Sequence, residues 1–208
     1  MAEILLSGFE PFAGADTNES WEAVRLATRQ LRDEGHDADA LLLPVEFARA
    51  GELLVERTRE LRPRIVVAAG LEAGRRAITP ERVAINVRDA RIPDNAGLAP
   101  VDEPCVAVPD VGWFSTLPVK AMATAAELAG APAQVSQTAG TFVCNDVFAL
   151  LMHALGADPA LAGTRGGFVH VPAAADLPVA VTARALALMA AIALTSEADE
   201  HRAAGAEH

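Results

Sequence analysis

Three side chains in this sequence have the types that nucleophilic catalysis needs. Cys144 follows the apolar segment TFV and precedes a stretch with helical spacing, His170 lies near the end of GGFVHVP, and Glu81 lies just before RVAINV. A thiol nucleophile needs a base, and the base needs a group that orients it. Residue types alone do not separate a catalytic cysteine from a small buried one, so the trio is a set of candidates at this point.

The place of Cys144 before a helix favours chemistry. Free N–H groups and the helix dipole at a helix N-terminus stabilise a thiolate, so the sequence predicts a lowered pKa for this thiol. The alternative is a cysteine that packs in the core as a small apolar side chain. His170 and Glu81 have similar alternatives, a strand histidine with satisfied hydrogen bonds and a solvated carboxylate.

Several common functional motifs are absent from the chain. It has no G-x-x-x-x-G-K-[ST] phosphate loop, no G-x-S-x-G nucleophile elbow and no G-x-G-x-x-G dinucleotide fingerprint. The five histidines are scattered without metal-ligand spacing, so no metal is expected. The net charge is −11 and no cluster of lysine and arginine occurs, which argues against nucleic acid and anionic membranes as partners.

The elements that must position these side chains alternate between strands and helices. Most of the expected strands are apolar on both faces, which indicates an α/β fold with a largely parallel sheet between two layers of helices. We expect a single three-layer α/β/α domain over residues 1–208, with a frayed polar tail from about residue 197. The expected strands are 3–9, 39–45, 64–70, 82–87, 133–138 and 166–172, and the expected helices are 18–35, 48–63, 115–130 (capped by Ser115), 144–156 and 177–197.

Composition and the character of the chain's apolar segments indicate the type of protein and its compartment. The chain is 51% hydrophobic, enough for a real core, and its two cysteines do not form a C-x-x-C motif. The N-terminus does not have the pattern of a signal peptide, and the apolar run 177–194 contains Arg184 and reads as a buried helix. We therefore expect a soluble, cytoplasmic protein. Ligands of open α/β sheets bind at the carboxyl ends of the strands, so the loops there should hold the site.

Four longer segments carry a family resemblance. GFEPFAG with NESWEAV, ITPERVAINVRDARIPDNAG, QTAGTFVCNDVF and GGFVHVP closely resemble type I pyroglutamyl peptidases, also called pyrrolidone-carboxylate peptidases, in order from residue 4 to about 195. The resemblance implies a cysteine peptidase that removes an N-terminal pyroglutamyl (5-oxoproline) residue from peptides. It implies a triad of Cys144, His170 and Glu81 on an α/β/α domain, no cofactor, and a homotetramer.

The same resemblance implies a binding pocket. It places Phe9, Phe12, Phe142 and Val143 around the substrate ring, main-chain groups near Leu71 on the lactam, and Asn18 where it orders the pocket. A lactam carries no charge, so apolar walls and a few hydrogen bonds would suffice for it. The Cys144 backbone N–H and Arg91 would stabilise the oxyanion. A structural ion pair of Arg91 with Asp89 or Asp94 is the alternative.

Three sequence segments depart from the family pattern and leave the substrate preference open. GLEAGRR replaces a loop that often has a Gly-Gly pair, NES replaces NPS, and HVPAAAD lacks the usual pattern after the histidine. A binding module that holds cyclic N-termini without cleaving them stays an alternative, as does a nucleoside phosphorylase-like transferase, which no phosphate loop supports. We expect no role for Cys105 or His153. Trp113 and Phe114 are either core residues or a contact between subunits.

Overall fold

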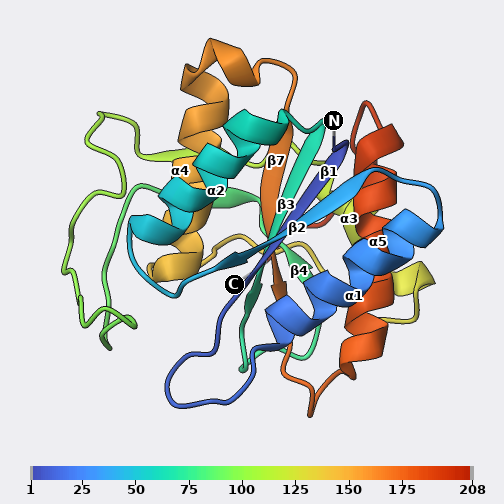
Figure 1. Cartoon of the computed structure of the whole chain (residues 1–208), viewed down its shortest axis with the longest axis horizontal. Coiled ribbons are helices and arrows are strands. Elements are labelled where there is room, and N and C mark those ends of the chain that lie inside the picture. The colour runs from blue at the N-terminus through green and yellow to red at the C-terminus, as the bar shows by residue number, and fades with distance from the viewer. Residues whose placement is uncertain (1, 207–208) are drawn as a thin grey trace.

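The computed structural model describes residues 2–206, and a five-stranded sheet forms its centre (Figure 1). The strands lie in the order β2-β1-β3-β7-β4, and all neighbours are parallel except β4 and β7, which are antiparallel. The largely parallel sheet predicted from the sequence is therefore confirmed. The strands are β1 (Ile4–Phe9), β2 (Ala38–Leu43), β3 (Ile65–Leu71), β4 (Thr79–Pro80) and β7 (Arg165–Val171).

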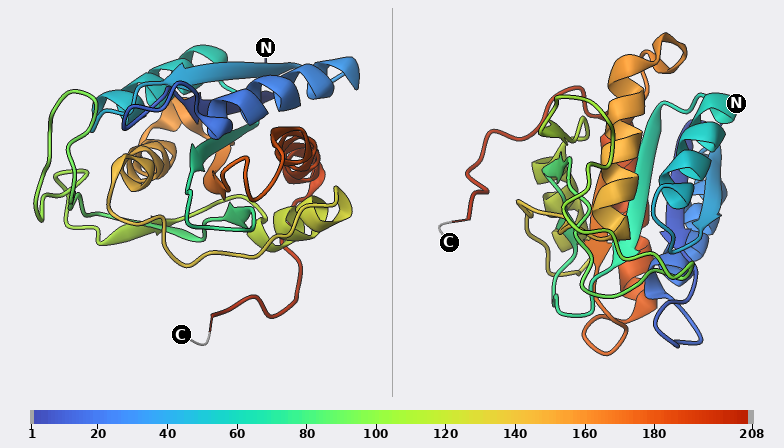
Figure 2. Two further views of the ribbon diagram at one scale, coloured as in Figure 1. Left: turned by 90° about the horizontal axis from the view of Figure 1, so that it is seen from below. Right: turned by 90° about the vertical axis from the view of Figure 1, so that its left-hand side faces the viewer.

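Helices cover both faces of this sheet, which confirms the predicted α/β/α layers (Figures 1 and 2). One face packs against α2 (Arg49–Leu61) and α4 (Val143–Ala157). The other face packs against α1 (Glu19–Asp33), α3 (Val119–Leu128) and α5 (Val179–Thr195). A short 3-10 helix, Pro159–Leu161, follows α4.

The central strands are apolar on both faces because both faces are buried. In β1, Leu5 packs in the cluster under α2 and α4, whereas Ile4 and Leu6 pack in the cluster under α1 and α5. Side chains alternate between the two faces of a strand, so each strand must supply apolar residues at every position. This explains why these strands appear in the sequence as continuous apolar runs.

The same alternation decides which strand residues point toward α4. Ala68 of β3 and Phe168 of β7 belong to the cluster under α2 and α4. Gly70 and His170 each come two residues later on the same strands, so they face the same side. The register pairs Gly70 with His170 directly. The start of α4 therefore lies over a glycine and beside a histidine.

The structure has a second, two-stranded sheet, of which the sequence predicted only one strand. β5 (Val83–Ile85) pairs antiparallel with β6 (Gly112–Phe114), and β6 was not expected because three residues are too short to show a period. The strand expected at 82–87 is shorter than predicted. The strand expected at 133–138 is wrong, since it forms only isolated bridges at Ala133 and Ser136. A long loop joins β5 to β6 and projects from the body (Figure 2).

The start of α3 also differs from the prediction. Ser115 does not cap it: the helix begins at Val119, and the Ser115 hydroxyl accepts from the backbone N–H of Leu117 at 3.2 Å. The first free N–H groups, those of Lys120 and Ala121, donate to the Asp199 carboxylate at 3.0 Å each. Because the capping residue Asp199 comes 79 residues after Lys120 in the chain, no local sequence pattern predicts this cap. Among the helices of residues 2–206, α5 included, none has the length and apolar character that a membrane span requires.

Candidate active site

Cys144 lies in the first turn of α4, as the sequence predicted. The helix begins at Val143, and Phe142 precedes it in an extended conformation. The sulfur occupies space that a side chain at position 70 would need, because a Cβ built on Gly70 would lie 2.8 Å from Cys144 Sγ. The same Cβ would meet the Phe168 ring at 2.8 Å. Gly70 is thus the residue that lets the thiol approach the sheet next to His170.

His170 and Glu81 form a direct pair. His170 Nδ1 lies 2.8 Å from Glu81 Oε1, and both side chains are buried. The edge strand β4 brings them together, since Thr79 pairs with His170 and the Glu81 N–H donates to the Phe168 carbonyl at 2.8 Å. A carboxylate hydrogen-bonded to Nδ1 orients the imidazole ring, so that Nε2 can accept or donate a proton. Within residues 2–206 the thiol and the imidazole share no hydrogen bond; such bonds often tighten only when substrate binds.

Arg75 completes this arrangement, and the sequence analysis missed it. Its Nη1 donates to Glu81 Oε1 at 2.6 Å and also to the Thr79 hydroxyl, and its Nη2 donates to the Thr138 carbonyl at 3.0 Å. Glu81 has no exposed surface, so its charge requires a partner. The only sequence signal was an arginine in the loop six residues before Glu81.

The expectation of a lowered pKa at Cys144 is wrong. Burial raises the pKa of the Cys144 thiol to about 12, and the negative charges of Glu72 and Glu81 act in the same direction. Arg75 and the residue's own backbone N–H oppose this rise without cancelling it. The helix N-terminus therefore contributes less than desolvation and the two carboxylates. A thiol in this state needs a base to become a nucleophile at neutral pH.

An apolar cavity of about 310 Å³ opens on one side of Cys144. The three predicted phenylalanines meet there: the Phe12 and Phe142 ring centroids are 5.4 Å apart, and Phe9 packs on Phe168 at 6.4 Å. Asn18 caps α1 through Ser20 and donates to the Glu10 carbonyl at 2.9 Å, which orders the loop after β1. The pocket residues predicted from the sequence all line this cavity, and Cys144 lines it with them: Phe9, Phe12, Asn18, Leu71, Phe142 and Val143.

A second, larger groove of about 610 Å³ adjoins this cavity and is also lined by Cys144. Cys144 and His170 both line it, together with the charged residues Glu72, Asp89 and Arg91. Arg91 forms no ion pair with Asp89 or Asp94 in the described part of the chain. Asp94 instead accepts backbone N–H groups, among them that of Phe47 at 2.8 Å. The structural alternative for Arg91 is therefore not observed.

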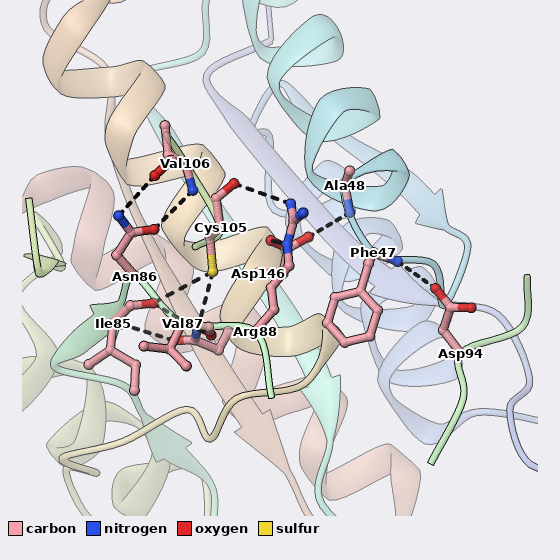
Figure 3. A network of polar contacts seen from close by, with 11 residues as sticks. Phe47, Ala48, Ile85, Asn86, Val87, Arg88, Asp94, Cys105, Val106 and Asp146 are labelled. Carbon is pink, nitrogen blue, oxygen red and sulfur yellow. Dashed lines mark hydrogen bonds and ion pairs between the residues drawn. The ribbon is translucent and has the colours of Figure 1, made fainter. Parts of the chain in front are cut away.

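The two residues after Cys144 bond to distant segments of the chain, and Figure 3 shows the contacts of Asp146 with Arg88 and Ala48. Asp146 is buried and accepts from Arg88 Nε at 2.6 Å and from the Ala48 N–H at 2.7 Å. Asn145 bonds to the backbone of Ile85 on both its N–H, at 3.0 Å, and its carbonyl, at 2.9 Å. Two buried polar residues in an apolar helix were the sequence signal for this network, and the sequence analysis did not use it.

The Ala48 contact holds an unusual backbone. Ala48 has φ 59° and ψ −57°, outside the regions that alanine favours, and the Arg49 N–H bonds back to the Phe47 carbonyl at 2.7 Å. This turn directs the Phe47 ring edge-on against Phe142, with centroids 5.2 Å apart. By accepting from the Ala48 N–H, the Asp146 carboxylate holds the turn that packs Phe47 against Phe142, and Phe142 lines the apolar cavity.

The remaining candidates have structural roles. Cys105 is buried, and burial raises the pKa of its thiol to about 12, so it resembles a packing residue. His153 packs against Trp113 at 5.6 Å, which places Trp113 in the core, whereas Phe114 is 70% exposed. Residues 2–206 contain no group of three or more histidine, cysteine or acidic side chains arranged to hold a metal ion.

Comparisons with known proteins show what the chain as a whole is similar to. Residues 2–197 match the family model described as pyroglutamyl peptidase. The chain is 45% identical to the pyrrolidone-carboxylate peptidase of Klebsiella pneumoniae, with all of both chains covered. It is 50% identical to that of Clavibacter michiganensis, with 83% of this chain and 79% of the relative covered.

Solved structures give the same result. The crystal structure of pyroglutamyl peptidase I from Bacillus amyloliquefaciens superposes with a TM-score of 0.89 at 36% identity, covering 96% of this chain and 100% of the other. The pyrrolidone carboxyl peptidase from Thermococcus litoralis gives a TM-score of 0.82 at 31% identity, with 93% and 94% covered.

Proposed function

The chain belongs to the pyroglutamyl peptidase family of cysteine peptidases, which remove an N-terminal pyroglutamate from peptides, and we propose that Cys144, His170 and Glu81 perform this reaction. One observation carries the assignment. The register of β3 and β7 sets Gly70 beside His170, and Cys144 Sγ lies over Gly70 while Glu81 holds His170 Nδ1 at 2.8 Å. Nucleophile, base and orienting group then share one edge of the sheet.

The apolar cavity suits the substrate ring. Pyroglutamate has no charged amine because the lactam has absorbed it, so a charged pocket would be unsuitable. Phe9, Phe12 and Phe142 provide faces for a small flat ring, and Val143 closes the floor. Main-chain groups near Leu71 lie at the cavity wall and can hold the lactam N–H and C=O. Asn18 keeps the phenylalanine loop in place.

The first half of the reaction transfers the acyl group to sulfur. His170 Nε2 takes the Cys144 proton as Sγ bonds to the pyroglutamyl carbonyl carbon. The carbonyl oxygen becomes an oxyanion, which the Cys144 backbone N–H and the Arg91 guanidinium stabilise. The C–N bond then breaks, and the leaving amine takes the proton from His170. Glu81 holds the imidazolium in orientation throughout, and Arg75 holds Glu81.

The second half returns the enzyme to its starting state. Water gives a proton to His170 Nε2, and its oxygen bonds to the thioester carbon. The C–S bond breaks, sulfur takes the proton back, and free pyroglutamate leaves the cavity. The raised pKa of Cys144, about 12, means that the thiolate is formed only during attack, so His170 is required in both halves.

Hydrolysis of a pyroglutamyl fluorophore tests this assignment. We expect turnover by the wild type, and losses of about 10²- to 10⁴-fold in Cys144→Ser and Glu81→Gln. Cys105→Ala is the matched control, since that thiol lies outside the site, and it should keep its activity. Full activity in Cys144→Ser would end the proposal.

A second candidate function is a binding module for cyclic N-termini that does not cleave them. The raised pKa of Cys144 favours it, because a protonated thiol is a poor nucleophile. The same experiment separates the two functions. Binding of a pyroglutamyl peptide by the wild type without any release of pyroglutamate would support the module.

We also propose a homotetramer and a cytoplasmic location. The family resemblance supports the first, and exposed apolar residues such as Phe114 and Val111 on and beside β6 are available for a contact between copies. Two free cysteines support a reducing compartment. Sedimentation of the wild type and of Phe114→Ser tests the assembly; a monomeric wild type would overturn it.

A further inference from the structure

The groove lined by Cys144 and His170 is the space next to the apolar cavity where the peptide that follows pyroglutamate can lie. The two cavities adjoin each other at five shared lining residues: Phe12, Leu71, Ala73, Phe142 and Cys144. If the ring occupies the apolar cavity of about 310 Å³, the scissile bond lies at Sγ and the leaving peptide extends into the groove of about 610 Å³. This step rests on the proposed function.

The walls of this groove carry two carboxylates without cationic partners. The Glu72 carboxylate accepts only a long hydrogen bond, 3.4 Å, from the Gly74 N–H. Asp89 uses its backbone to bond with Thr141, and its side chain has no partner within residues 2–206. The nearby Arg75 does not neutralise Glu72, because its guanidinium is engaged by Glu81, Thr79 and Thr138.

We propose that this groove selects peptides with a cationic side chain in the first or second position after pyroglutamate, and that Glu72 and Asp89 are the selecting residues. A lysine or arginine side chain there would find two unpaired carboxylates in a partly enclosed groove. Arg91 lines the same groove, but its assigned role is at the oxyanion beside Cys144, which leaves the excess charge of the walls negative.

Two further observations support the selection of cations. The negative charge of Glu72 reaches the reaction centre, since it contributes to the raised pKa of the Cys144 thiol. The whole chain carries a net charge of −11, so its field attracts cationic peptides and repels acidic ones before contact. Both effects act on the same substrates in the same direction.

Three matched peptides test the inference: pyroglutamyl-Lys-Ala amide, pyroglutamyl-Gln-Ala amide and pyroglutamyl-Glu-Ala amide. Release of pyroglutamate gives kcat/KM for each with the wild type, Glu72→Gln, Asp89→Asn and the double variant. Glu127→Gln is the control, because it removes one exposed carboxylate from α3 in the opposite helix layer. Dissociation constants of the same peptides for Cys144→Ala measure selection without turnover.

We expect the wild type to prefer lysine over glutamine, and glutamine over glutamate. Each carboxylate should contribute about twofold to fivefold, the range of exposed ion pairs, and the ratio should shrink in high salt. The double variant should approach a ratio of one, while Glu127→Gln keeps the wild-type ratio. Equal rates for lysine and glutamate peptides, a preference for glutamate, or an unchanged ratio in the double variant would overturn the inference. Failure to cleave even the glutamine peptide would instead contradict the proposed function, and the dissociation constants would still decide the selection.

Discussion

Cys144 Sγ occupies the space that a side chain on Gly70 would need, with only 2.8 Å between the sulfur and a Cβ built at that position. Glycine at position 70 therefore leaves the room that the Cys144 thiol needs above β3, because even one methyl group there would collide with the sulfur. The relationship joins α4 to the strand that neighbours His170, so it ties the position of the thiol to the position of its base.

Gly70→Ala should lower activity by about 10²-fold without unfolding the protein. The added methyl must push away either Cys144 Sγ or the Phe168 ring, and a displacement of about 1 Å at a reacting atom costs about 10²-fold in rate. Hydrolysis of a pyroglutamyl fluorophore measures this loss, and circular dichroism checks the fold. Gly156→Ala is the control: a Cβ there meets nothing within 4 Å, and it should leave the rate unchanged. Normal activity in Gly70→Ala would show that the thiol does not need its observed place.

Arg75→Met should lower kcat far more than it changes KM. Arg75 contacts Glu81 and does not line the apolar cavity, so its loss disturbs the orientation of His170 rather than the binding of the ring. A drop of about 10- to 100-fold is expected, together with a loss of about 3–5 kcal/mol in unfolding free energy, since the buried Glu81 carboxylate would lose its cation and keep only the hydrogen bond with His170.

The neighbouring arginine provides the control for that experiment. Arg76 is 91% exposed in its side chain and has only a 3.7 Å contact with Asp176, so Arg76→Met should alter neither rate nor stability measurably. Arg75→Lys should recover part of the rate by restoring the charge on Glu81. An Arg75→Met enzyme with a raised KM and an unchanged kcat would contradict the positioning role.

The rate of alkylation of Cys144 should rise steadily with pH from neutral to strongly alkaline solution. Its pKa of about 12 means that the thiolate fraction at pH 7 is very small and increases about tenfold with each pH unit below the pKa. Iodoacetamide labelling, located by mass spectrometry, measures the profile, and Cys144→Ala isolates the labelling of Cys105. A plateau between pH 6 and about 8 would instead indicate a thiolate stabilised by the helix.

The same raised pKa has a consequence for folding. An unfolded cysteine titrates near about 8.5, so below that pH both states hold the proton and no stability is lost. Above it the unfolded state releases its proton first, and the unfolding free energy should fall as pH rises toward about 12. Denaturant unfolding at pH 8 and about 10 should show a smaller fall for Cys144→Ala than for the wild type. Equal falls in both proteins would contradict the raised pKa.

Asp146→Asn should destabilise the protein and raise KM. The substitution leaves Arg88 as a largely buried, unpaired cation and weakens the bond to the Ala48 N–H, with an expected loss of about 3–5 kcal/mol. Phe142, which lines the apolar cavity, then loses the support of the Phe47 ring packed against it, so ring binding suffers. Ala48→Gly is the companion variant. It relaxes the φ of 59° and should preserve or increase stability, while a large loss would mean that the turn is unstrained.

Much of the fold could be predicted because the local signals agree. Apolar runs with glycine or proline at their ends predicted the four long strands, and spacing with Asn18 predicted α1. The errors lie where the signal is short or non-local. β6 has three residues, and the N–H groups at the start of α3 are met by Asp199 from the far end of the chain. No window of neighbouring residues contains that information.

The sequence by itself determined the residue types of the site and the family, because the segments around Glu81, Cys144 and His170 are long and specific. Only the tertiary structure decided how these groups act on each other. It showed that Arg75 holds Glu81, that burial and two carboxylates outweigh the helix N-terminus at Cys144, and that the thiol lines both an apolar cavity and an adjoining groove with charged walls. Desolvation and charge interactions depend on distances through space, which chain order does not encode.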